Sequence, residues 1–171
     1  IAFLSFYSGE VYRGVETYVQ ELSSRLKTSH EVVVYEGGTS ATIKDFTKKV
    51  LGEIDPETDL IVATNGGWQS LLCKLWCIKN RKKLVIPGQS GPGRDDRINL
   101  FCRPDIFVAL TNYQAGWAKA NGFGVRVEII PNGVDLEKFN PEVEPFKIDL
   151  PTPIILNVSA LTKDKRLDLV I

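Results

Sequence analysis

The stretch IAFLSFYSGEVYRGVETYVQELSSRLKTSHEVVVY, residues 1–35, decides the fold. It begins with an apolar run, residues 1–6, and ends with another, Glu31–Tyr35. Between them, Gly14 to Lys27 carries one stripe of apolar residues at helical spacing, which consists of Val15, Val19, Leu22 and Leu26. Near-continuous apolar strands are typical of parallel strands that are covered on both faces. The stretch therefore predicts a strand–helix–strand unit of a parallel sheet.

The same alternation continues along the chain. Further strands are predicted at Asp59–Thr64, Leu84–Pro87, Asp105–Thr111 and Val125–Pro131. Helices are predicted at about Ile43–Leu51, at Gly67–Lys79, and at Asn112–Asn121 with Asn112 as its cap. The helix at 67–79 is apolar on nearly all sides, so we expect it to be well buried. The alternation predicts an α/β fold, a doubly wound parallel sheet of the Rossmann-like type.

The end of the chain predicts the beginning of a second domain. Ile129–Asp135 is typical of a strand that stops in a tight polar loop. Pro153–Ser159 then predicts a new strand and Lys163–Ile171 a new helix. We therefore expect residues 1–150 to form the first domain and residues 151–171 to begin a truncated second one, with the segment after 150 less well anchored.

Composition narrows the classes of function. The 171 residues are 43% hydrophobic and 25% charged, with a formal net charge of +0, which gives a nucleic-acid partner no global electrostatic support. No apolar run approaches the roughly 20 residues that span a bilayer. Three cysteines give no disulfide framework, so we expect a reducing, cytoplasmic setting. The basic run Lys79–Lys83 is read first as a solvated helix end, and peripheral membrane contact is its second interpretation.

Loops at the carboxyl ends of parallel strands are where ligands bind in such sheets. The first of them, Ser8–Glu16, carries two glycines and enters a helix, so its free N–H groups can meet an anion. It matches neither of the common glycine-rich phosphate motifs, and a plain turn is an equal interpretation. Thr64–Gly67 and Asn132–Asp135 are expected on the same rim.

The longest rim loop is Gly88–Arg97, with glycines, prolines and many polar groups. Its paired Asp95 and Asp96 could act as a base or bind a metal, but such a pair is more often held by neighbouring arginines or caps a helix. Because Asp96 is expected in this exposed loop, Asp96→Ala is expected to lower the free energy of unfolding only slightly. The sole histidine, His30, stands away from the rim, which argues against Ser–His–Asp or Cys–His hydrolases and against a His-rich metal site.

Three stretches together resemble the family 4 glycosyltransferases of the two-domain GT-B fold. Arg13–Glu16, with its helix and Ser29–Val32, is similar to the family's glycine–glutamate loop and second strand. Ile130–Asp135 with the following Phe139 and Pro141 closely matches its link at the end of the N-terminal domain. Leu156–Leu161 with Lys165 is similar to the opening of its donor domain.

The resemblance implies a metal-independent, retaining transfer from a nucleotide diphosphate sugar, a co-substrate, with no further cofactor. It implies a role in glycan or cell-envelope biosynthesis and a glycan, lipid or small-molecule acceptor. Gly14 and Lys165 would contact the donor diphosphate. Gln89 and Asp96 are the candidates for catalysis, although Gln89 stands near the place where many members have a His and cannot serve as a base. The expected acceptor-side residues are Tyr12, Arg13, Ser90, Arg94, Asp96 and Asn132.

The chain also departs from the family. Ser159-Ala160 stands where the family often has Gly-Arg, so one phosphate contact is lost, and the family's acidic donor-domain motif would lie beyond Ile171. Two alternatives stay open: a nucleotide-sugar 2-epimerase of the same architecture, and a non-catalytic anion-binding module. For a transferase, we expect the 171 residues alone to be inactive.

Overall fold

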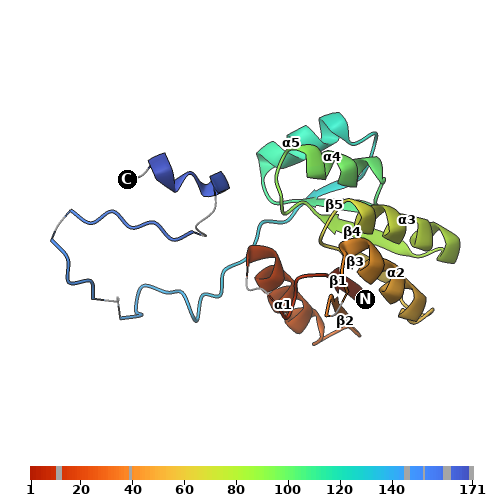
Figure 1. Ribbon diagram of the computed structural model, residues 1–171, viewed down its shortest axis with the longest axis horizontal. Helices are drawn as coiled ribbons and strands as arrows, with labels where there is room; N and C mark the ends of the chain where they lie inside the picture. Colours follow the sequence, from red (N-terminus) through yellow and green to blue (C-terminus); the bar gives the residue numbers. More distant parts are fainter. Residues whose placement is uncertain (11–12, 39, 145–146, 152, 160–162, 170–171) are drawn as a thin grey trace. The chain divides into compact units, whose positions relative to one another are not determined.

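Six apolar runs form one parallel sheet in the computed structural model, which describes residues 1–10, 13–38, 40–144, 147–151, 153–159 and 163–169 (Figure 1). The strand order is β2-β1-β3-β4-β5-β6, and every neighbouring pair is parallel. This confirms the predicted sheet. The strands are β1 Ala2–Ser5, β2 Val33–Glu36, β3 Leu60–Ala63, β4 Lys83–Pro87, β5 Ile106–Ala109 and β6 Val127–Ile129.

Helices cover both faces of this sheet. The first connection leads from β1 outward to the edge strand β2, and each later one leads the other way across the sheet. Because such crossovers are right-handed, the first helix packs on one face and the others pack on the opposite face. The doubly wound, Rossmann-like α/β class is thereby confirmed. The helices are α1 Gly14–Leu26, α2 Ile43–Glu53, α3 Trp68–Asn80, α4 Arg94–Phe101 and α5 Asn112–Asn121.

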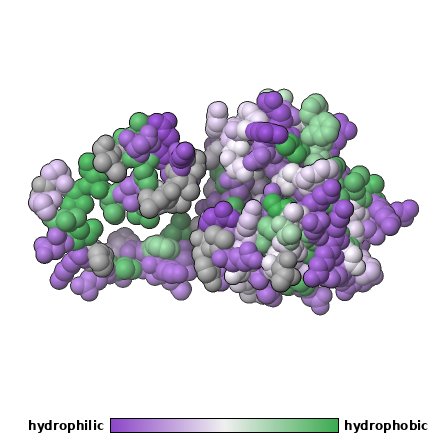
Figure 2. Space-filling view, viewed as in Figure 1, coloured by the Kyte–Doolittle hydropathy of each residue, from purple (hydrophilic) through white to green (hydrophobic). Residues whose placement is uncertain are grey.

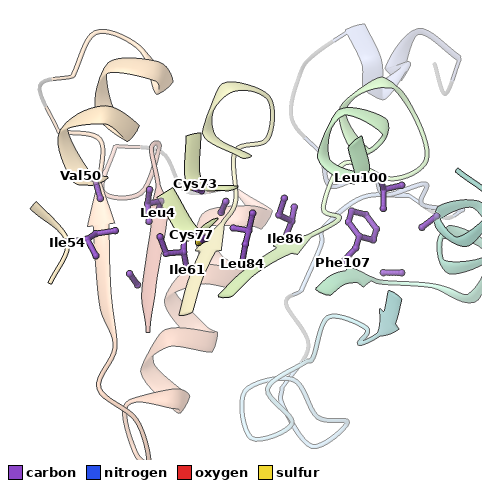
Figure 3. Packing of buried hydrophobic residues seen from close by; sticks show 14 of the residues in the cluster. Leu4, Val50, Ile54, Ile61, Cys73, Cys77, Leu84, Ile86, Leu100 and Phe107 are labelled. Carbon is purple, nitrogen blue, oxygen red and sulfur yellow. The ribbon is translucent and has the colours of Figure 1, made fainter. Parts of the chain in front are cut away.

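Alternating strand residues supply two hydrophobic layers. Phe3 belongs to the smaller cluster, beneath α1, and Leu4 to the larger one on the other face. The larger cluster runs across the sheet from Val50 of α2 and its C-cap Ile54 to Leu100 of α4 and Phe107 of β5 (Figure 3). Burial on both faces explains why the central strands β1, β3, β4 and β5 lack a polar–apolar alternation, whereas the edge strands β2 and β6 are partly exposed.

Helix α4 corrects the prediction of a loop over residues 88–97. Arg94 begins this helix, which runs on to Phe101. Only Leu100 among its apolar residues is fully buried, while Ile98 and Phe101 are exposed. No apolar stripe therefore marked the helix in the sequence.

Helix α3 is less buried than predicted. Cys73 and Cys77 face the core, but the opposite side carries exposed apolar residues. The sheet covers only one side of this helix, and α2 packs beside it. The exposed residues are Trp68, Leu71, Leu75 and Ile78.

Thr111, rather than Asn112, caps α5. Its side-chain oxygen accepts a hydrogen bond from the backbone N–H of Gln114, at 3.1 Å, and its own backbone is extended. Asn112 is instead the first helical residue. A cap stands one residue outside the helix, so the prediction was displaced by one position.

The chain divides into two compact units, Ile1–Gly133 and Val134–Ile171. In the second unit, Asp135 Oδ1 accepts hydrogen bonds from the backbone N–H groups of Glu137 and Lys138. The predicted strand at Pro153–Ser159 is wrong for the described residues 153–159, which form no strand. The predicted helix after Lys163 is replaced by two short 3-10 helices, η1 Lys163–Lys165 and η2 Leu167–Leu169.

An apolar run needs partner strands to form a sheet, and within its described residues the second unit contains none. The described residues 153–159 are all exposed. The domain boundary at residue 150 rests on the start of a second strand–helix unit, and it stays a prediction.

Candidate functional site

A cleft of about 370 Å³ lies at the carboxyl edge of the sheet. It is lined by the loops after β1, β3 and β4, by the first turn of α1, by Asp95 and Asn99 of α4, and by Asn132 after β6. The loops after the neighbouring strands β1 and β3 lead to α1 and α3, on opposite faces of the sheet. This divergence opens the crevice in which doubly wound sheets bind their ligands.

The N-terminus of α1 forms one wall of the cleft. The N-cap residue Arg13 has an extended backbone and makes no side-chain cap, so no side chain of its own satisfies the first N–H groups of the helix. Gly14 follows as the first helical residue, and a Cβ built there would meet nothing within 4 Å. Neither packing nor a left-handed backbone therefore requires glycine at this position. The wall can receive an anion at close range.

Charges in the cleft nearly balance. Arg13 Nη2 lies 3.6 Å from Glu16 Oε1, and the Arg13 guanidinium stands 4.6 Å from the centre of the Tyr7 ring. Glu16 is 6% exposed, and its Oε2 atom has no hydrogen-bond partner among the residues that the structure describes. Asp95, at the start of α4, adds a second carboxylate to the lining. Among the residues that the structure describes, the lining therefore holds one cation and two anions.

Asn65 ties the floor of the cleft together. Its Oδ1 atom accepts hydrogen bonds from the Phe6 backbone N–H at 2.7 Å and from Gln69 Nε2 at 3.3 Å. Gln69 returns the contact, because its Oε1 accepts from the Asn65 backbone N–H at 2.9 Å. The loop after β1 is thereby held to the beginning of α3.

Gln89 and Asn132 join the far side of the cleft. Gln89 Nε2 lies 3.4 Å from Asn132 Oδ1, and Asn132 Nδ2 lies 3.5 Å from Gln89 Oε1. The two amides are at the long limit of hydrogen bonding, so each can exchange its partner for a ligand hydroxyl. The structure thus brings two predicted residues, 43 positions apart in sequence, to one place.

Asp96 lies inside the molecule, which corrects its predicted place on the rim. It is 0% exposed, and its Oδ2 atom accepts a hydrogen bond from Gln114 Nε2 at 2.7 Å. Gln114 Nε2 also donates to the Gly88 carbonyl at 2.6 Å, and Gln114 Oε1 accepts from the Leu110 backbone N–H. Burial raises the pKa of the Asp96 carboxyl although Gln114 donates to it. The neighbour Asp95, not Asp96, lines the cleft.

The other predicted residues are placed as follows. Ser90 and Arg13 line the cleft, whereas Arg94 is exposed and does not line it. Tyr12 lies outside the described residues, as does Ala160. Lys165 belongs to η1 in the second unit. Its predicted contact with a diphosphate stays a prediction, as does that of Gly14.

Several lining residues were not named as site candidates. Glu16 entered the prediction only through the first loop and its resemblance to the family's glycine–glutamate loop, and Asn65 only through the Thr64–Gly67 rim loop. Asn99 lines the cleft from α4, where its Oδ1 accepts a hydrogen bond from Ser70 Oγ at 2.7 Å. The position of Asn65 directly after a predicted strand could have indicated it as a site residue. Nothing in the sequence indicated Asn99, because helix α4 was not predicted.

The described residues contain neither a metal-binding group of side chains nor an exposed cysteine. No group of three His, Cys, Asp or Glu side chains gathers there as a metal site. Cys73, Cys77 and Cys102 are buried free thiols in the large core cluster or beside it. Burial raises the pKa of the Cys77 thiol to about 11, and it also raises the pKa of Cys73. The helices that the structure describes include none that is long and apolar enough to cross a membrane.

Comparison with known proteins identifies a structural neighbour. No protein-family model matches the chain, and no curated protein matches its sequence. The fold is similar to that of Anabaena Alr3699/HepE, whose crystal structure was determined in complex with UDP. The TM-score is 0.52 and the sequence identity 19%, over 82% of this chain and 46% of that chain. The likeness shows a shared fold, and this chain spans about half the length of that neighbour.

Proposed function

We propose that this chain is the acceptor-side part of a glycosyltransferase that transfers a sugar from a nucleotide diphosphate sugar. One observation carries the proposal. The cleft at the carboxyl edge has the open N-terminus of α1 as a wall, in a fold similar to that of a protein that was crystallised with UDP. UDP is the product that a UDP-sugar leaves behind after transfer, so the two findings point to one substrate class.

In this proposal the donor diphosphate approaches the backbone at Gly14. Free N–H groups and the positive end of the helix dipole favour its negative charge there. The absence of a side chain lets the phosphate come within hydrogen-bonding distance of the backbone. Lys165 supplies further positive charge once the donor domain, predicted to begin after residue 150, is complete.

The acceptor occupies the polar side of the cleft. Amides and hydroxyls prevail there, in Asn65, Asn99, Gln89, Asn132 and Ser90. Such groups exchange hydrogen bonds with sugar hydroxyls without bringing charge. Gln89 cannot take up a proton, so its role is to position a hydroxyl. The family 4 type and retention of the anomeric configuration rest on the sequence resemblance and belong to this proposal.

The test measures UDP release from UDP-sugars by the protein at its natural full length. We expect release to depend on an added acceptor, and NMR of the product to report the same anomeric configuration as the donor. If UDP-sugars bind without an acceptor and are not turned over, the transferase proposal is overturned and the anion-binding module is favoured. Interconversion of the donor sugar at its second carbon would favour the epimerase.

The matched pair Gly14→Ala and Gly52→Ala tests the site itself. Both glycines are helical, and at both an added Cβ would meet nothing within 4 Å, so neither substitution disturbs packing. We expect Gly14→Ala to weaken UDP binding by about two- to fivefold, which corresponds to the roughly 0.3–1 kcal/mol that one exposed helix terminus contributes. Gly52→Ala should leave binding unchanged. Equal binding by both variants would remove α1 from the donor site.

A further inference from the structure

The outer side of α3 forms a continuous apolar stripe. Trp68, Leu71, Leu75 and Ile78 follow one another at steps of three, four and three residues, so they share one face of the helix. Their exposed fractions are 56%, 38%, 56% and 63%. In Figure 2, hydrophobic residues reach the viewed surface over α3, among hydrophilic ones. We call these four residues the α3 stripe.

Cations surround the α3 stripe. Lys44, on the neighbouring helix α2, places its Nζ 4.5 Å from the centre of the Trp68 ring. Lys79, Arg81 and Lys82 follow Ile78 at the other end of the stripe, and they form no ion pair within the part of the chain that the structure describes. Residues 60–93 hold five lysines and arginines and no acidic residue, although the whole chain has 21 of each sign. Two of the five, Lys74 and Lys83, pair with Asp105, so the positive charge beside the exposed apolar side chains comes from Lys44, Lys79, Arg81 and Lys82.

We propose that the α3 stripe docks this protein onto an anionic lipid bilayer, with α3 lying in the plane of the headgroups. Helices that bind in this way present Leu and Trp to the acyl boundary and Lys and Arg to the anionic headgroups. Tryptophan suits the boundary because its ring is apolar and its N–H is polar. The inference does not depend on the proposed transferase activity.

Electrostatics favour a lipid surface over a second copy of the chain. Two α3 stripes that packed together would bring their lysines and arginines face to face, and like charges there oppose association. Four side chains on one helix are also few beside the roughly 20 residues that each partner gives to a stable protein interface. Interfacial binding needs only one amphipathic face.

The test is co-sedimentation of the 171-residue chain with vesicles. One set contains equal parts of phosphatidylcholine and phosphatidylglycerol, and the other contains phosphatidylcholine alone. We expect binding to the anionic set only, weakened by salt because surface charges are screened. Leu75→Gln with Ile78→Gln should lower the partition coefficient by about tenfold or more, and so should Lys79→Gln with Lys82→Gln.

Matched controls come from other surfaces. Tyr113→Gln removes an apolar side chain that is 76% exposed on α5, and Lys27→Gln removes an exposed cation after α1, on the opposite face of the sheet. Both should bind as the unchanged chain does, and thermal unfolding should be alike for all variants. Equal binding to neutral vesicles, no binding to either set, or equal loss in the controls would overturn the proposal. A dimer in solution that Leu75→Gln with Ile78→Gln dissociates would also overturn it.

Discussion

The Asp96 carboxylate accepts a hydrogen bond inside the molecule, and this determines what its truncation does. Gln114 Nε2 carries two hydrogens, one donated to Gly88 and one to Asp96. Asp96→Ala leaves the second donor buried without an acceptor, which costs about 1–3 kcal/mol of unfolding free energy. Urea denaturation measures this cost. The exposed neighbour provides the control, because Asp95→Ala should change stability by no more than about 0.5 kcal/mol. Equal effects would show that Gln114 finds another partner.

The same carboxyl makes stability depend on pH. Burial raises the pKa of Asp96 above its usual 3.8, so the folded protein holds this proton more tightly than the unfolded chain. The protonated Asp96 carboxyl therefore stabilises the folded protein. This contribution to the unfolding free energy is fully present below the pKa of the unfolded chain, and it is lost as the pH rises through the higher pKa of the folded protein. Asp96→Asn does not titrate, and the other groups are common to both proteins. The unfolding free energy of the variant relative to the unchanged protein should rise from pH 3.8 upward and then level off. A constant or falling difference between the two denaturation series would contradict the inferred burial.

At the scale of elements, the cap of α5 can be tested by one substitution. Thr111 Oγ1 accepts from the Gln114 backbone N–H, which is otherwise without a partner at the helix start. Thr111→Ala should lower the unfolding free energy by about 1 kcal/mol. Asn112→Ala is the matched control, since Asn112 is exposed and already helical, and it should cost less than Thr111→Ala. Chemical denaturation distinguishes the two. A larger loss for Asn112→Ala would assign the cap to the residue that the sequence first suggested.

Elements with strong apolar patterns were predictable, and α4 was not. Ile61, Leu84 and Phe107 lie in strands that are apolar on both faces, so length and composition sufficed to place them. In α4 a single apolar side chain, Leu100, is buried in the core, and a glycine-rich stretch precedes the helix. This helix lies where it does because it connects two parallel neighbouring strands, β4 and β5, and such a connection must cross over the sheet. The displacement of Asp96 from loop to interior follows from the same cause.

At the scale of the whole molecule, the rim of the site was predictable because topology places it. Parallel strands bring their carboxyl ends together, so the sequence alone predicts Gly14, Gln89 and Asn132 on one edge of the sheet. The individual contacts were not predictable. Asn65 and Asn99 take part through hydrogen bonds that depend on how α3 and α4 pack, and sequence spacing does not encode that packing. The exposure of the α3 stripe was not predictable either. An apolar helix has the same sequence pattern whether the protein covers one of its sides or all of them.

The balance of charge in the cleft predicts how the 171 residues alone will bind nucleotides. A diphosphate brings negative charge, and the described lining offers one arginine beside two carboxylates, Glu16 and Asp95. The N–H groups at Gly14 remain as the main attraction, and one helix terminus contributes about 0.3–1 kcal/mol at an exposed site. That amount falls well short of the roughly 4 kcal/mol that corresponds to a millimolar dissociation constant.

We therefore expect calorimetry to find UDP and UDP-sugars bound to this chain with dissociation constants of about 1 mM or weaker, and no turnover. Glu16→Gln tests the electrostatic reason, because it releases Arg13 from its ion pair and removes one carboxylate from the wall. This variant should bind UDP more tightly than the unchanged chain, and Glu21→Gln, an exposed carboxylate further along α1, should not. Micromolar binding by the unchanged chain would mean that residues 1–171 hold a complete nucleotide site, and the division of the donor between two domains would then be wrong.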